Sequence, residues 1–142
     1  MSIVSAVFDY ISSQPSIVDE LGRYDFGSGD APALFTVEPA PEDSGAPLIV
    51  IQQPTGNEGT ARDRTHKGGQ AFIDVKLWGN KTDSEKKIRD LADTIWTTLD
   101  RADLTVSGFE FVNCIATPPQ RLADPDGFPG YIVPLQVTVR TL

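Results

Sequence analysis

Apolar and polar residues follow two different periods in the second half of the chain. Residues 70–78 alternate between apolar and polar side chains, and a period of two predicts a half-buried strand. In residues 82–101 the apolar positions recur at helical spacing, which predicts a long helix with one buried stripe. The stripe comprises Ile88, Leu91, Ala92, Ile95 and Leu99. Thr82, followed three residues later by Glu85, predicts a capping box at the start of this helix.

Two further strand patterns close the chain. Residues 109–117 are rich in aromatic and aliphatic side chains, and residues 131–140 alternate strictly, so both segments are predicted to be strands. The segment between them, residues 118–130, is too long for a tight hairpin turn. Pro134 lies inside the last strand and has no N–H to donate to a neighbour. We therefore expect this strand to be an edge strand or to bulge at Pro134.

The first half of the chain predicts shorter elements. Ser2 is a suitable cap for a first helix of about ten residues, which Pro15 would end. Ser16 would cap one further helical turn. Residues 33–37 and 48–53 are short apolar runs separated by a proline-rich loop, and we expect them to pair as a hairpin.

A long segment, residues 54–69, separates the two halves and contains four glycines and almost no large apolar side chain. It cannot bury enough surface to offset the entropy of ordering, so it predicts a long loop. Loops of this length inside a compact domain are uncommon and are usually functional or disordered. Basic residues concentrate there, namely Arg62, Arg64, His66 and Lys67. They form either a solvated loop tip or part of an arm that orders against a partner.

Length and charge limit the classes of protein that fit. The 142 residues, 39% of them hydrophobic, predict a single domain spanning residues 1–142. The predicted fold is α+β: a mixed or mainly antiparallel β-sheet of about four to six strands, with the long helix on one face and the N-terminal helix beside it. The net charge of −8 argues against specific DNA binding, because phosphate neutralisation needs a concentrated basic surface. No leader-like segment or long apolar run suggests secretion or a membrane span.

Candidate catalytic and metal-binding motifs are fragmentary. The only cysteine, Cys114, and the only histidine, His66, cannot form a zinc site with the usual ligands. Cys114 lies in a strand-like run without a recognisable histidine partner, which favours a core thiol over a nucleophile. Residues 124–127 lack the spacing and the final glutamate of a calcium loop and predict a turn. The sequence therefore predicts no catalytic residue, no cofactor and no metal, and a protein that is not an enzyme.

The order of strand, long helix and two closing strands over residues 70–142, preceded by an N-terminal helix and a long loop, resembles one known family. It is that of the tail-terminator proteins, also called tail-completion or tail-to-head joining proteins, of long-tailed bacteriophages (siphoviruses) and gene transfer agents. The resemblance covers most of the chain and rests on this pattern rather than on a motif. It implies a structural virion protein in the tail-neck region, which is present in the host cytoplasm during assembly.

The resemblance also implies a mechanism and partners. A homohexameric ring would cap the tail tube protein, stop tube polymerisation and join the tail to the head-side connector or stopper protein. DNA would pass through the lumen without specific binding, and no membrane would be involved. Residues expected at the contacts lie in the two long loops and near the proline of the last strand: Arg62, Arg64, His66, Lys67, Asp126, Phe128 and Pro134.

Two alternatives remain open from the sequence. One is another neck component, such as a stopper or head-completion protein, although these resemble small barrels or helical adaptors. The other is a monomeric cytosolic module that binds a protein partner. The molecular mass in solution separates a ring from a monomer.

Overall fold

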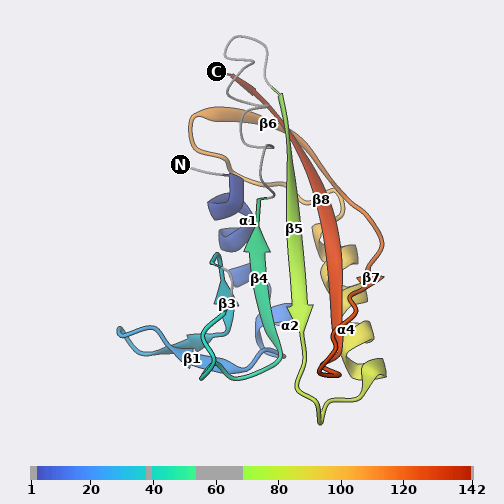
Figure 1. Ribbon diagram of the computed structural model, residues 1–142. Coiled ribbons are helices and arrows are strands. Elements are labelled where there is room, and N and C mark those ends of the chain that lie inside the picture. Colours follow the sequence, from blue (N-terminus) through green and yellow to red (C-terminus); the bar gives the residue numbers. More distant parts are fainter. Residues whose placement is uncertain (1–2, 38–39, 54–68, 142) are drawn as a thin grey trace.

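The computed structural model of the chain describes residues 3–37, 40–53 and 69–141. The predicted loop at residues 54–68, with its four basic side chains, lies outside the described residues, as does the predicted cap Ser2. The described elements, drawn in Figure 1, are α1 (Ile3–Ser12), α2 (Pro15–Val18), β1 (Arg23–Asp25), β2 (Asp30–Pro32), β3 (Leu34–Phe35), β4 (Leu48–Gln52), β5 (Gly69–Trp78), α4 (Glu85–Leu99), β6 (Phe109–Ala116), β7 (Gln120–Arg121) and β8 (Gly130–Thr141).

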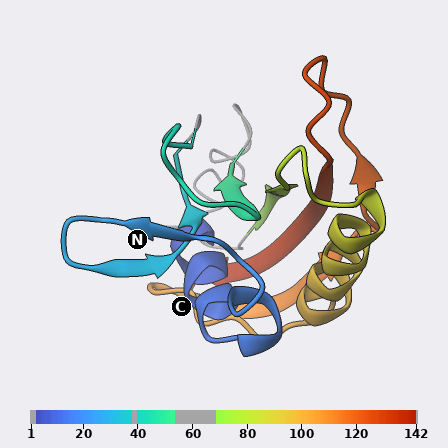
Figure 2. The same ribbon diagram turned by 90° about the horizontal axis from the view of Figure 1, so that it is seen from below.

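The fold is α+β, as the hydrophobic pattern predicts. Six strands form a mixed sheet of order β3-β4-β5-β8-β6, and β7 pairs with β8 beyond the end of β6. Helices α1, α2 and α4 lie on one face of this sheet (Figure 2). The long pair β5 and β8 occupies its centre, with an antiparallel register from Gly69 opposite Val139 to Trp78 opposite Gly130.

Alternation along β5 and β8 places one set of side chains under the helices. Every second residue of β8 from Tyr131 to Val139 is buried, and so are the residues of β5 that share this face. The predicted stripe of α4 covers them, and all of its residues are buried: Ile88, Leu91, Ala92, Ile95 and Leu99. The main hydrophobic core therefore forms between the sheet and the helices, with Val7 and Ile11 of α1 contributing to it.

The helix α4 begins later than the capping box predicts. Ser84, not Thr82, is the N-cap, and its Oγ accepts a hydrogen bond from the Lys87 N–H at 3.1 Å. Thr82 lies instead in a turn closed by the bond from the Asp83 N–H to the Asn80 carbonyl at 3.0 Å. The Asp83 carboxylate accepts from the Asn80 N–H at 2.8 Å, and this bond, with Lys87 nearby, lowers the pKa of Asp83. The turn occupies the residues that a cap at Thr82 would need.

The N-terminal helices also differ from the prediction in their boundaries. Helix α1 ends at Ser12, before Pro15, and Pro15 opens α2 rather than terminating α1. A proline is tolerated in a first helical turn, because its missing N–H would have no helical partner there. The N-cap of α2 is Gln14, so the expectation that Ser16 would cap this turn is wrong.

The predicted hairpin between the two early apolar runs is wrong. Strand β3 runs parallel to β4, with Leu34 opposite Ile49. The connecting loop folds back against the start of β1, where the Gly45 N–H donates to the Arg23 carbonyl at 3.0 Å. A Cβ atom on Gly22 would lie 2.4 Å from the Ala46 nitrogen, so this close approach requires glycine. The loop thereby returns the chain to the same end of the sheet, which makes the two strands parallel.

A hairpin that the sequence does not predict precedes β3. Strands β1 and β2 pair from Arg23 opposite Pro32 to Asp25 opposite Asp30, and the hairpin extends away from the body of the molecule (Figure 2). Gly27 and Gly29 in its turn have φ angles of 92° and 124°, which favour glycine. Two aromatic contacts attach the hairpin to Phe35 of β3, an edge-to-face contact from Tyr24 and a tilted contact from Phe26, each with ring centroids 5.4 Å apart.

Pro134 lies in a central strand, so the expectation that its strand would be an edge is wrong. It faces Asp74 of β5, and on the other side of β8 the partner changes from β7 to β6 near this position. The Pro134 carbonyl accepts a bond from the Thr117 N–H at 2.8 Å. The nitrogen and carbonyl of one strand residue point to the same neighbour. The missing N–H therefore falls at the break between β6 and β7, where no ladder bond is lost. The register shift of the β6–β8 pair occurs elsewhere, between Phe111 and Asn113.

Candidate functional site

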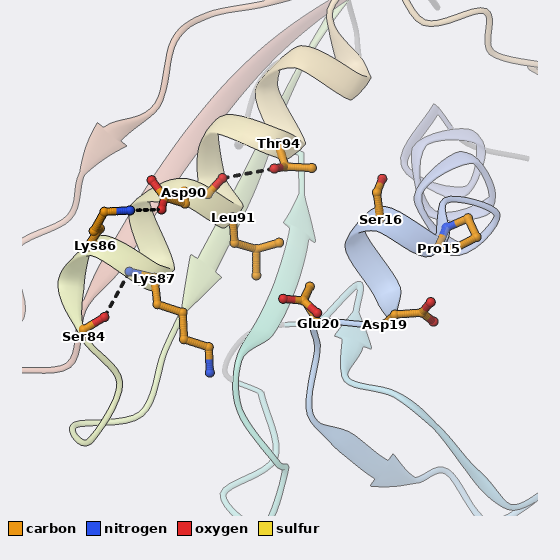
Figure 3. Close-up of a pocket in the computed structure, with 10 residues that line it drawn as sticks. All are labelled: Pro15, Ser16, Asp19, Glu20, Ser84, Lys86, Lys87, Asp90, Leu91 and Thr94. Atoms are coloured by element: carbon orange, nitrogen blue, oxygen red, sulfur yellow. Dashed lines mark hydrogen bonds and ion pairs between the residues drawn. The ribbon is translucent and has the colours of Figure 1, made fainter.

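A groove of about 780 Å³ lies between α2 and the first half of α4 (Figure 3). One wall carries Asp19 and Glu20, and the other carries two lysines. The full lining is Pro15, Ser16, Asp19, Glu20, Ser84, Lys86, Lys87, Asp90, Leu91 and Thr94.

The lysines of this groove are already paired within α4 or its N-terminal turn. Lys86 contacts Asp90 at 2.7 Å and Lys87 contacts Asp83 at 3.2 Å. The Ser84 hydroxyl is engaged as the helix cap. The lining contains neither histidine nor cysteine. The polar side chains that α4 contributes to this groove are therefore engaged within the chain itself.

Asp126 and Phe128, two of the predicted contact residues, lie in one ordered turn. The Asp124 carboxylate accepts hydrogen bonds from the Asp126 N–H at 3.1 Å and from the Phe128 N–H at 3.0 Å, which confirms the predicted turn. Asp126 is exposed, whereas Phe128 is half-buried with the Lys81 ammonium 5.3 Å from its ring centre. Arg121 of β7 pairs with Glu85, so this loop is tied to the start of α4.

Pro134, the third described contact residue, is half-buried on the sheet face opposite the helices. That face also carries Phe72, Val112 and Ile115, which are exposed by 41%, 41% and 44%. Sequence reasoning missed these residues. They stand at strand positions that alternate with the buried residues and that usually carry polar side chains. An apolar residue at such a position is the signal by which the sequence could have revealed them. The remaining predicted residues, Arg62, Arg64, His66 and Lys67, lie outside the described part of the chain.

Cys114 is a core thiol, in agreement with the sequence analysis. Its side chain has no exposed surface. Burial, and secondarily the negative charge of Asp100, raises the pKa of this thiol to about 11. A carboxylate oxygen of Asp100 accepts the Ala116 N–H at 3.0 Å, which fixes the charge beside the strand. A thiol held in its protonated form is a poor nucleophile.

The part of the chain that the structure describes shows neither a metal-binding cluster nor a membrane-spanning helix. Within residues 3–37, 40–53 and 69–141, no three His, Cys, Asp or Glu side chains gather in a way that could hold a metal ion. None of the helices described there is long and apolar enough to cross a membrane.

The comparisons with known proteins identify the family. The sequence profile of the family described as Tail completion protein gp17 matches residues 29–141, a range that contains the six-stranded sheet and α4. The chain therefore belongs to the tail completion protein gp17 family, and it is a structural protein of a virion tail. The resemblance inferred from the order of the elements is confirmed.

A solved structure shows the same fold. A chain of the structure titled "Virion of native gene transfer agent (GTA) particle" superposes with a TM-score of 0.68 at 15% sequence identity, covering 97% of this chain and 94% of that chain. At this identity the similarity concerns the fold. No curated protein matches the sequence.

Proposed function

We propose that this chain is a tail terminator: copies assemble into a homohexameric ring that caps the finished tail tube, stops tube polymerisation and joins the tail to the head connector. The observation that carries the proposal is the family match over residues 29–141. The similarity in fold to a chain of a gene transfer agent virion supports it. The proposed partners are further copies of the chain, the tail tube protein and the head-side connector or stopper protein.

The proposed action is steric and requires no catalytic residue or cofactor. One face of the ring would bind the tube, the other would bind the connector, and each subunit would consist of one domain. The net charge of −8 is suited to a lumen through which DNA passes without binding, because like charges repel. The proposed contact residues remain Arg62, Arg64, His66, Lys67, Asp126, Phe128 and Pro134.

The shape of the fold favours this role over the neck alternative. Stopper and head-completion proteins were expected to be small barrels or helical adaptors. The described chain is an open sheet with helices on one face.

The experiment combines the mass in solution with an assembly assay. Light scattering on the purified chain should give a discrete oligomer, and electron micrographs should show rings of uniform size. Adding the chain to polymerising tube protein should give tubes of defined length, whereas tubes formed without it should keep growing. A strict monomer that leaves tube growth unchanged would contradict the proposal and would favour a monomeric binding module.

A further inference from the structure

Large apolar side chains are exposed at both ends of the strand order. At the β3 end, Phe26 of the β1–β2 hairpin and Val37 are exposed by 45% and 62%. At the β6 end, Val112 and Ile115 are exposed by 41% and 44%. A contact that joins unlike surfaces on opposite sides of a subunit can repeat from copy to copy, and it closes into a ring if the rotation allows.

The hairpin end is concave. A pocket of about 300 Å³ opens between the hairpin, α1 and α2. Phe26 forms one wall, Phe8 and Val18 come from the helices, and Leu34 comes from β3. The complete lining is Phe8, Ser12, Val18, Phe26, Ser28, Ala31, Pro32 and Leu34. A concave and mainly apolar surface of this kind is suited to apolar side chains.

The β6 end is also hollowed, because Val112 and Ile115 line a second pocket of about 300 Å³ together with Arg101, Ala102 and Asp103. The register of β6 against β8 shifts between Phe111 and Asn113, so Val112 is an extra residue in the strand. An extra residue bends the strand and changes the direction of the neighbouring side chains. Val112 and Ile115 are exposed, whereas Cys114 and Ala116 of the same strand are buried and hold it against the core.

The charges around the two surfaces are partly complementary. Asp25 and Asp30 are exposed on the hairpin. Arg101 is exposed beside Val112 and Ile115, where its backbone N–H donates to the Cys114 carbonyl at 2.8 Å. No ion pair joins the Arg101 side chain to another described residue. An apolar centre with charges at its rim is the usual arrangement of a specific interface.

We propose that neighbouring copies join head to tail, with Val112 and Ile115 of one copy packed against the apolar side chains that line the pocket under the β1–β2 hairpin of the next. The proposal rests on the self-association proposed above and names its two surfaces. Arg101 approaches the hairpin carboxylates of the next copy. Asp103 lies on the same rim as Arg101 and is repelled by them, so Asp103→Asn tightens the contact.

Chemical cross-linking tests which surfaces meet. Ser28 lines the pocket and Asn113 lies between Val112 and Ile115, and both are exposed. Cysteines at these two positions, in a Cys114→Ala background, leave the apolar contact intact. A short bismaleimide should convert the Ser28→Cys/Asn113→Cys variant into a ladder of covalent oligomers. A mixture of the two single variants should stop at dimers, because each copy then carries only one reactive surface. A matched control pairs Ser28→Cys with Asp93→Cys on the exposed side of α4, and it should give no ladder.

A substitution pair measures the apolar contact. Ile115→Asp should weaken self-association by at least about tenfold, because it places a charge against apolar side chains. Phe72→Asp, at a similarly exposed position on β5, should leave association unchanged. The far-ultraviolet circular dichroism of both variants reports whether they are folded.

The outcomes separate this inference from the ring itself. In one case mass and microscopy show a ring, but cross-linking gives no ladder, or gives equal ladders from the Ser28/Asn113 and Ser28/Asp93 pairs. Either result overturns the hairpin contact without contradicting the ring. A wild-type chain that stays monomeric overturns both.

Discussion

At the scale of single residues, Ile95 lies at the centre of the contact between α4 and the sheet, and it has no exposed surface. Replacing a buried isoleucine by alanine typically costs about 2 to 5 kcal/mol, because apolar contacts are lost and a cavity remains. Ile95→Ala should lower the free energy of unfolding by this amount in a denaturant melt. The matched control is Asp93→Ala, two residues earlier on the exposed side of the same helix, which should change it by less than about 0.5 kcal/mol. Equal effects of the two substitutions would mean that α4 is not held by its stripe.

Cys114 provides a second test at this scale. Because burial, with the charge of Asp100, raises its pKa from 9.0 to about 11, the folded protein should react very slowly with a thiol reagent such as iodoacetamide at pH 8. The unfolded chain should react at the rate of an ordinary cysteine. The folded state binds the thiol proton more tightly, so this contribution to stability is complete below pH 9 and is lost as the pH rises towards 11. Rapid modification of the folded chain at pH 8 would contradict the burial of Cys114.

At the scale of elements, the start of α4 distinguishes two neighbouring hydroxyl residues. Ser84 caps the helix by accepting the Lys87 N–H, whereas Thr82 lies in the preceding turn. Removing an N-cap side chain typically costs about 1 kcal/mol. Ser84→Ala should therefore lower the unfolding free energy by about this amount, and Thr82→Ala should change it by only a few tenths. A larger loss for Thr82→Ala would restore the capping box that the sequence pattern predicts.

The elements also explain why the sequence identified some surfaces and missed others. The turn that contains Asp126 and Phe128 follows from its local chemistry, since aspartate and glycine form turns through their own backbone. The exposed pair Val112 and Ile115 has no such signature. A run of apolar residues in a strand also fits a strand buried on both faces. Only the fold shows that the helices cover one face of the sheet (Figure 2), so that side chains on the other face are exposed even on the central strand β5, as Phe72 is.

At the scale of the whole molecule, the segment at residues 54–68 is proposed to contact the tail tube or the next subunit. It joins β4 to β5. Because Gln52 at the end of β4 lies opposite Asp74, a shorter linker must still run alongside β5 from Ile73 back to Gly69, where β5 begins. A linker of about eight glycine and serine residues covers this length at about 3.3 Å per residue.

The variant with this linker should fold normally, because loop-closure entropy changes slowly with length. It should nevertheless fail to terminate tubes, which electron microscopy would reveal as tubes of abnormal length. A variant that keeps the length but replaces Arg62, Arg64 and Lys67 by serine serves as the control for charge. If the shortened protein still terminated tubes normally, the result would contradict the proposed role of this segment.

The assembly as a whole should depend on protein contacts alone. Cys114 is buried, and the described ranges contain no metal-ligand cluster. EDTA and dithiothreitol should therefore leave the mass of any oligomer unchanged in light scattering, since neither a bound metal nor a disulfide would hold it together. Dissociation by the chelator would reveal a metal site that the described residues do not provide.

The sequence by itself determined the elements with long hydrophobic repeats. The hydrophobic pattern predicts helix α4 and strands β5 and β8 to within a few residues, because each buries one full face and burial imposes the period directly. The order of these elements was also sufficient to indicate the family.

Only the tertiary structure decided which strands are neighbours. The parallel pairing of β3 with β4, the β1–β2 hairpin and the central place of β8 depend on contacts between residues far apart in the chain, or on glycines at close approaches such as Gly22. A proline within a strand indicates an edge strand, because it has no N–H to donate to a neighbour. In the fold, the Pro134 nitrogen faces the break between β6 and β7, where no ladder hydrogen bond is needed. Strand pairing is a non-local choice, so a period of two reveals that a strand has a buried face and does not reveal its partner.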